Sequence, residues 1–188
     1  HLLPNGHVIL STATDGASIA GIAFNAEDLV LYDPLLQTAT LVFDGSAAGR
    51  FSSDTADIDS VHVLYNNSYT PASWTIILST SANATLGTNA LAFQDNDIVS
   101  FNMSTGVATL LEDGNDDDLF AGATGDISAL FLRYDDANKY ILSTSDADIT
   151  IATSGEQLSY ERGELIEVDL TTPDDPQTDP LFCDDQVP

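Results

Sequence analysis

Basic residues and cysteine are almost missing from this sequence. Of 188 residues only 4 are Lys or Arg, against 30 Asp and Glu, and the formal net charge is -26. Such a chain repels phosphate groups, and the four scattered cations, Arg50, Arg133, Lys139 and Arg162, cannot form a basic patch. Binding to nucleic acid and to anionic membranes is therefore excluded. Cys183 is the only cysteine, so no intrachain disulfide can form.

Long apolar runs and residues that favour helices are also scarce. No stretch approaches the roughly 18 consecutive apolar residues of a membrane-spanning helix. The acids are mainly Asp, whereas Glu and Lys, which fill exposed helix faces, are few. Asp, Ser and Thr favour turns and strand ends. The composition therefore predicts an all-β fold with little helix.

The acidic charge must lie on the surface of a folded body. Hydrophobic residues make up 43% of the chain and the mean hydropathy is +0.02, which is too apolar for a disordered polyanion. Surface repulsion is screened in salt, so this charge suits a saline, extracellular or cell-surface setting. The chain begins with His1 instead of Met, which we interpret as a removed leader or a cut from a longer chain.

Internal repeats organise the chain. Ile-Leu-Ser-Thr occurs three times, each copy is followed by an aligned acid-containing block, and a third type of block occurs twice. These blocks lie at 9–12, 77–80 and 141–144, at 24–33, 93–102 and 160–169, and at 39–45 and 108–114. A fourth block, 57–64, matches 126–132, and its end matches 1–3. We predict one repeat domain over 1–170, with repeats at about 1–50, 57–118 and 126–170, and a Pro- and Asp-rich tail at 171–188.

Each repeat is expected to form four antiparallel strands, because its blocks are short, apolar or β-branched, and bounded by turn residues. Four such strands in roughly 60 residues resemble a β-propeller blade. Over residues 1–170 the pattern resembles the Asp-rich propeller-type repeats of secreted bacterial proteins. Three blades are too few to close a ring. Completion by a second chain, a β-trefoil-like barrel and an open array are the alternatives.

The clearest candidate for a ligand site is the loop at 113–118. Ca²⁺ takes six to eight oxygen ligands, and a tight turn containing Gly can direct several carboxylates at one ion. Adjacent acids also repel each other unless a cation neutralises them. We therefore predict a Ca²⁺ site, with a solvated acidic loop as the alternative, formed by Asp113, Asn115, Asp116, Asp117 and Asp118.

Several polar positions align between repeats and indicate structural roles. The aligned sets are an acid at 28, 97 and 164 and a serine at 11, 79 and 143. One active site does not need three copies, so we expect these side chains to tie strand ends to the backbone. His1 and His62 share a strand position, which indicates packing. Asp57, Asp59 and Asp126 are expected to cap turns, with lining of a central channel as the alternative.

The function predicted from these features is a non-catalytic structural or adhesive extracellular module, stiffened by Ca²⁺. The first repeat starts within its first strand and the third lacks its fourth, so open strand edges favour self-association. The alternative is a glycoside-acting enzyme with two carboxylates across a channel or cleft. No motif nominates a catalytic or cofactor-binding residue. Tyr65, Tyr69 and Trp74 either stack on a carbohydrate or pack internally.

Overall fold

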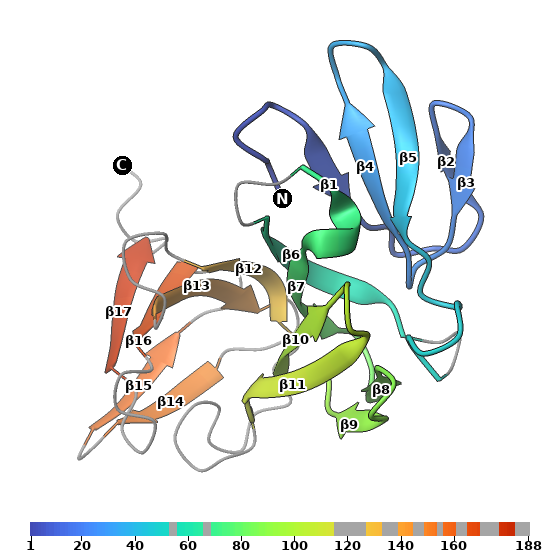
Figure 1. Ribbon diagram of the computed structural model, residues 1–188. Helices are drawn as coiled ribbons and strands as arrows, with labels where there is room; N and C mark the ends of the chain where they lie inside the picture. The colour runs from blue at the N-terminus through green and yellow to red at the C-terminus, as the bar shows by residue number, and fades with distance from the viewer. Residues whose placement is uncertain are drawn as a thin grey trace.

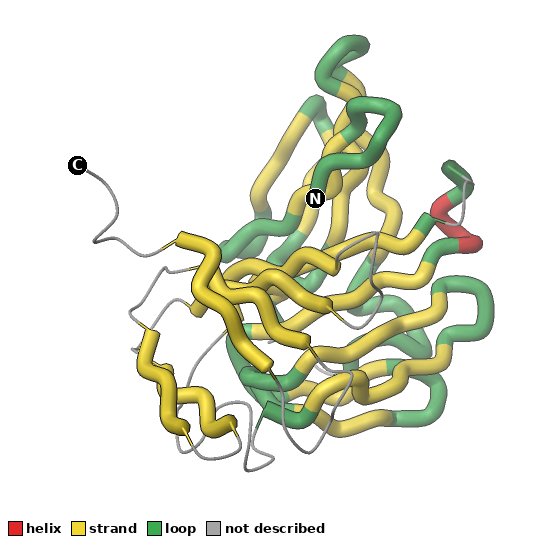
Figure 2. The backbone as a smooth tube through the Cα atoms, turned by 90° about the vertical axis from the view of Figure 1, so that its left-hand side faces the viewer, coloured by secondary structure: helices red, strands yellow, loops and turns green. Residues whose placement is uncertain are grey.

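The fold is all-β (Figures 1 and 2). The computed structural model describes residues 1–52, 56–65, 69–114, 127–132, 139–144, 149–153, 156–160, 165–169 and 177–182. Within these ranges every strand pair is antiparallel, no sheet closes into a barrel, and the single helical turn is the 3₁₀ segment η1, Pro71–Ser73. The predicted all-β class with antiparallel sheets is thereby confirmed.

The middle sheet has four strands and an inserted hairpin. Its order is β11-β10-β7-β6, and the β8-β9 hairpin lies between β7 and β10 in the chain. The bounds are β6 (Ile58–Leu64), β7 (Thr75–Thr80), β8 (Ala84–Leu86), β9 (Leu91–Phe93), β10 (Ile98–Asn102) and β11 (Val107–Glu112). The repeated blocks predict the four long strands but not the hairpin.

The other two large sheets follow the same chain order. The last sheet runs β12-β13-β16-β17 with the β14-β15 hairpin inserted, and the first runs β1-β4-β5 with the β2-β3 hairpin inserted. The last sheet has β12 (Ile127–Leu132), β13 (Lys139–Thr144), β14 (Ile149–Thr153), β15 (Glu156–Tyr160), β16 (Leu165–Asp169) and β17 (Gln177–Phe182). The first has β1 (Val8–Leu10), β2 (Ala17–Ile19), β3 (Ile22–Phe24), β4 (Leu29–Asp33) and β5 (Thr38–Phe43).

The expectation that the last repeat lacks its fourth strand is wrong. Gln177–Phe182, within the segment predicted as a tail, forms β17 and pairs with β16. Pro180 stands opposite Ile166, beside a break in the register, and β17 is the edge strand of its sheet. Proline is tolerated at such positions, because the missing N–H would not have bonded to a further strand.

Irregularities in pairing recur at matching positions of the three sheets. The register shifts between Leu29 and Val30 where β4 meets β5, between Ile98 and Val99 where β10 meets β11, and between Leu165 and Ile166 where β16 meets β17. A second shift occurs in β6 after Ile58 and in β12 after Ile127. These bulges fix the register of each sheet locally.

Two hydrophobic cores lie between the large sheets. One joins the first and middle sheets around Phe43, Trp74 and Phe101, and the other joins the middle and last sheets around Ile77 and Leu142. The middle sheet is thus covered on both faces. This explains why β7 reads as an uninterrupted apolar run, Ile-Ile-Leu, since alternate side chains enter opposite cores.

Candidate functional site

The first-strand segments of the three sheets meet at one place through aligned side chains. The His1 and His62 rings lie edge to face with centroids 4.4 Å apart, and His62 and Phe131 do the same at 5.1 Å. Residues 1–3, β6 and β12 supply these three rings, one each. The predicted packing role of His1 and His62 is therefore confirmed.

His62 is fully buried and joins the middle sheet to the last one. The backbone N–H of Leu132 donates to His62 Nδ1 at 3.3 Å, and so Nδ1 carries no proton when this bond forms. Burial lowers the pKa of His62 to about 4. The imidazole is thus neutral near pH 7 and acts as a hydrogen-bond acceptor between sheets.

Acidification should therefore destabilise the protein through His62. Its pKa is about 4 in the folded protein and 6.5 in the unfolded chain, so the unfolded state takes up the proton first as pH falls. Between pH 7.5 and pH 5 the free energy of unfolding falls by about 2 kcal/mol because of this group, and the decrease levels off below pH 4. We expect His62→Gln, which keeps an acceptor but does not titrate, to lose this component of the pH dependence.

The measurement is urea unfolding at several pH values for the wild type, His62→Gln and, as a control, His7→Gln. His7 is partly exposed and its Nε2 lies 3.4 Å from Asp33. Parallel curves for the wild type and His62→Gln would contradict the buried neutral imidazole.

Next to the ring contact lies an open pocket of about 590 Å³. Four segments line it: residues 1–2, residues 9–11 at the end of β1, residues 59–61 of β6 and residues 128–131 of β12. Asp59 is the one acid among the described residues that line it. Its position in the lining of this pocket leaves both expectations, a turn cap or the lining of a central channel, as predictions.

The aligned acids Asp28 and Asp97 clasp strand ends to the backbone. Asp28 accepts hydrogen bonds from the N–H of Asn25 and of Gly45, both at 2.8 Å. In the middle sheet Asp97 accepts from Gln94 at 2.7 Å and from Gly114 at 2.9 Å. Both carboxylates are buried. The predicted structural role is confirmed for these two acids, while Glu164 lies outside the described residues.

Of the aligned serines, Ser79 shows the predicted structural role through its side chain. The Ser79 hydroxyl lies 2.6 Å from the Ser60 hydroxyl across the β6-β7 pair, and it donates to the Ile127 carbonyl oxygen at 2.8 Å. Ser79 therefore ties the middle sheet to β12. In the last sheet the backbone carbonyl oxygen of Ser143, not its side chain, accepts a hydrogen bond of 3.3 Å from the Ser128 hydroxyl.

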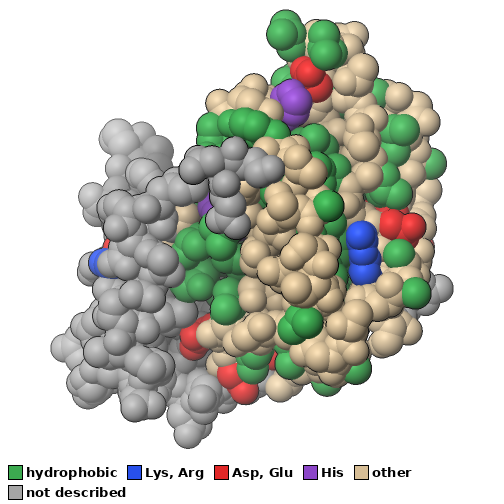
Figure 3. Space-filling model, in the orientation of Figure 1, with side chains coloured by type: hydrophobic (Ala, Val, Ile, Leu, Met, Phe, Trp, Pro, Cys, Tyr) green, Lys and Arg blue, Asp and Glu red, His purple; other side chains and the backbone are tan. Residues whose placement is uncertain are grey.

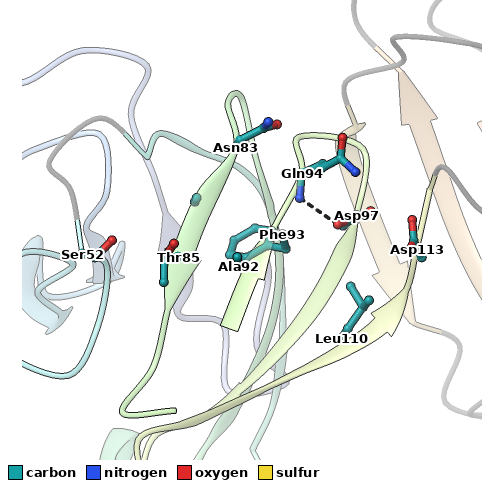
Figure 4. A pocket seen from close by; sticks show the side chains of 10 residues that line it. Ser52, Asn83, Thr85, Ala92, Phe93, Gln94, Asp97, Leu110 and Asp113 are labelled. Carbon is teal, nitrogen blue, oxygen red and sulfur yellow. Dashed lines mark hydrogen bonds between the residues drawn. The ribbon is translucent and has the colours of Figure 1, made fainter. Parts of the chain in front are cut away.

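A second pocket, of about 520 Å³, lies beside the β8-β9 hairpin (Figure 4). Asn83, Thr85 and Gln94 line it with Phe93, and it holds two carboxylates, Asp97 and Asp113. Both oxygens of Asp97 already accept backbone N–H groups. Burial raises the pKa of Asp97, while these two hydrogen bonds act in the opposite direction. Asp97 is thus held as a hydrogen-bond acceptor for the backbone, and the nearby charge of Asp113 is a further cause that raises its pKa.

The predicted Ca²⁺ loop is described only at its start. Asp113 lines the second pocket, whereas Asn115, Asp116, Asp117 and Asp118 lie outside the described residues. Elsewhere in the described ranges, no cluster of three or more His, Cys, Asp or Glu side chains is arranged to hold a metal ion.

Of the three aromatic residues considered for carbohydrate stacking, Trp74 packs internally, whereas Tyr69 is exposed. Trp74 is 1% exposed and lies in the core between the first and middle sheets. Tyr65 and Tyr69 stack on each other with centroids 5.5 Å apart. Trp74 therefore offers no face to a sugar.

Few basic side chains appear among those coloured by type in Figure 3, in keeping with the composition. Among the described residues no helix is long and apolar enough to cross a membrane.

No protein-family model matches the sequence, and a search of curated proteins finds no match.

Proposed function

We propose that this chain is a non-catalytic repeat module of an extracellular structural or adhesive assembly. Three propeller-blade-like units would form it, and open strand edges would join it to a further copy of the chain. The observation that carries the proposal is the common order of the three large sheets, each with a hairpin inserted at the same point. A repeat scaffold uses the same structural unit several times. An active site instead needs a set of residues that only one of the units supplies.

The use of the acids supports a structural module over an enzyme. Asp28 and Asp97 are buried and aligned, and both carboxylate oxygens of each accept hydrogen bonds from backbone N–H groups. A glycoside hydrolase needs two carboxyl groups that face the bond to be broken. The net charge of -26 supports a saline, extracellular setting, where salt screens the repulsion between copies.

The test is sedimentation velocity in saline buffer from low to high micromolar concentration, with Ca²⁺ or with chelator. We expect the mass to rise with concentration, and to rise further with Ca²⁺ if the loop at 113–118 binds it. Asp116→Ala with Asp118→Ala should then abolish the difference between Ca²⁺ and chelator. A strictly monomeric chain at high micromolar concentration in Ca²⁺ would contradict self-association.

A further inference from the structure

The open end of the β8-β9 hairpin carries two amide side chains. Ala84 pairs with Phe93, so Asn83, which precedes β8, and Gln94, which follows β9, lie on neighbouring segments of the chain. Both residues are exposed and line the pocket of about 520 Å³ (Figure 4). Among the described residues neither side chain has a hydrogen-bond partner. Two amides are therefore available to a ligand at this end of the pocket.

Two hydroxyl groups lie further along the same lining. The N–H of Ser52 donates to the Thr85 carbonyl oxygen at 3.0 Å, and the N–H of Gly87 donates to the Arg50 carbonyl oxygen at 3.1 Å. Residues 50–52 thus run antiparallel along the outer edge of β8 and place Ser52 beside Thr85. Both line the pocket, and within the described ranges neither hydroxyl is hydrogen-bonded.

The aligned side chains of the first sheet are used differently. Asp15 stands at the position of Asn83 in the first repeat. Asn25 likewise stands at the position of Gln94. The side chains of Asp15 and Asn25 each accept a backbone N–H at 3.2 Å, so they hold the local fold together. The middle sheet folds without these contacts, and its two amides are not needed for the turn.

The charges in the lining restrict the ligand. The pocket contains two carboxylates, Asp97 and Asp113, and among its described residues no basic side chain. Phosphates, sulfates and acidic sugars are therefore repelled. Both oxygens of Asp97 accept backbone N–H groups, and the described residues contain no cluster arranged to hold a metal ion. An uncharged, polar ligand fits this lining best.

We propose that this pocket binds a neutral carbohydrate. Amide and hydroxyl side chains both donate and accept hydrogen bonds, as the hydroxyl groups of a sugar do. Asn83 and Gln94 bind hydroxyl groups at one end of the ligand, and Ser52 and Thr85 bind others along its length. The inference rests on the adhesive role in the proposed function and names the class of ligand for it.

The size and the apolar part of the pocket agree with this ligand. Its volume is within the range of about 300 to 1,000 Å³ found for ligand sites. Leu110, which is 36% exposed, and the exposed Ala92 add apolar surface to the lining. Such surface suits the C–H groups of a sugar ring, while the amides and hydroxyls take its polar groups.

The experiment is an NMR titration in saline buffer with neutral trisaccharides of glucose, galactose, mannose and N-acetylglucosamine. Each is added up to about 10 mM, a concentration that detects dissociation constants in the millimolar range. We expect at least one of them to shift the side-chain amide signals of Asn83 and Gln94. The amide of Asn5, which accepts the N–H of His7 in a separate turn, should not shift.

Two variants locate the binding. Asn83→Ala and Gln94→Ala should each weaken binding about fivefold or more, because each removes a hydrogen-bonding group from the ligand. Both should unfold in urea at the wild-type midpoint, since the described residues make no hydrogen bond to either side chain. The control is Ser18→Ala, which removes an exposed hydroxyl from β2 in the hairpin of the first sheet and should bind as the wild type does.

Trisaccharides of galacturonic acid and of glucosamine, which are negatively and positively charged, test the charge of the ligand. Tighter binding of either one than of every neutral sugar would overturn the uncharged ligand. The carbohydrate site itself would be overturned if no neutral sugar shifted the two amides, or if both alanine variants bound as tightly as the wild type.

Failure of this inference differs from failure of the proposed function. A chain that self-associates in sedimentation but binds none of the neutral sugars is a structural module without this site. A monomeric chain whose Asn83 and Gln94 signals shift keeps the carbohydrate site and loses self-assembly.

Discussion

Replacement of Asp97 by alanine is expected to lower the free energy of unfolding by about 4 kcal/mol. The carboxylate is 3% exposed, and it accepts hydrogen bonds from the backbone of Gln94 and Gly114. Alanine leaves both N–H groups without their acceptor, and hydrogen bonds to charged groups contribute about 1.5 to 3 kcal/mol each. Asp28→Ala should have an effect of similar size in the first sheet, because Asp28 makes the same two contacts.

Two variants act as controls for this prediction, and the stability of every variant is measured by urea unfolding. Asp97→Asn retains one acceptor oxygen and should fall between alanine and the wild type. Asp95→Ala removes a carboxylate from the same turn and should change stability by less than about 1 kcal/mol. If Asp95→Ala lowers the free energy of unfolding as much as Asp97→Ala does, the net charge controls stability, and the two hydrogen bonds of Asp97 to the backbone do not.

Substitution of alanine for Gly114 is expected to destabilise the protein by about 3 kcal/mol. An added Cβ would lie 2.2 Å from the backbone oxygen of Asn96, and backbone atoms cannot turn aside as a side chain can. Gly45 has the matching contact, with a Cβ 2.3 Å from the backbone oxygen of Glu27, so Gly45→Ala should behave in the same way.

This second effect is also read from unfolding curves, with Ser46→Ala as the control. Ser46 is next to Gly45, is exposed and bonds only to Asp44 among the described residues. Its replacement should have little effect. Wild-type stability in Gly45→Ala and Gly114→Ala would show that the close approach of these loops is not required.

The strands that the sequence predicts best are those whose residues repeat. The Ile-Leu-Ser-Thr blocks begin within or form parts of β1, β7 and β13, and the block beginning at Phe93 contains β10. In these segments the internal alignment, the β-branched residues and the flanking turns agree. The role of Asp28 and Asp97 was also predictable, since a buried acid repeated in each unit is best explained by backbone contacts.

Other elements were missed for physical reasons. The hairpin strands β8 and β9 have only three residues each, too few to show a period of two. The strand β17 was hidden by Pro180 and by a longer connection, seven residues from β16 instead of the four that join β4 to β5. The inner pocket could not be predicted, because it depends on how β1, β6 and β12 are placed in space and not on any motif.

The three large sheets share one strand order, with three strands in the first sheet and four in each of the others, and β17 completes the last of them. Cross-strand NMR contacts between β16 and β17 test this shared order most directly. The register places Val168 opposite Thr178 and Glu167 opposite Asp179, so backbone proton contacts between these pairs are expected. Random-coil chemical shifts over residues 177–182, with no contacts to β16, would contradict the account.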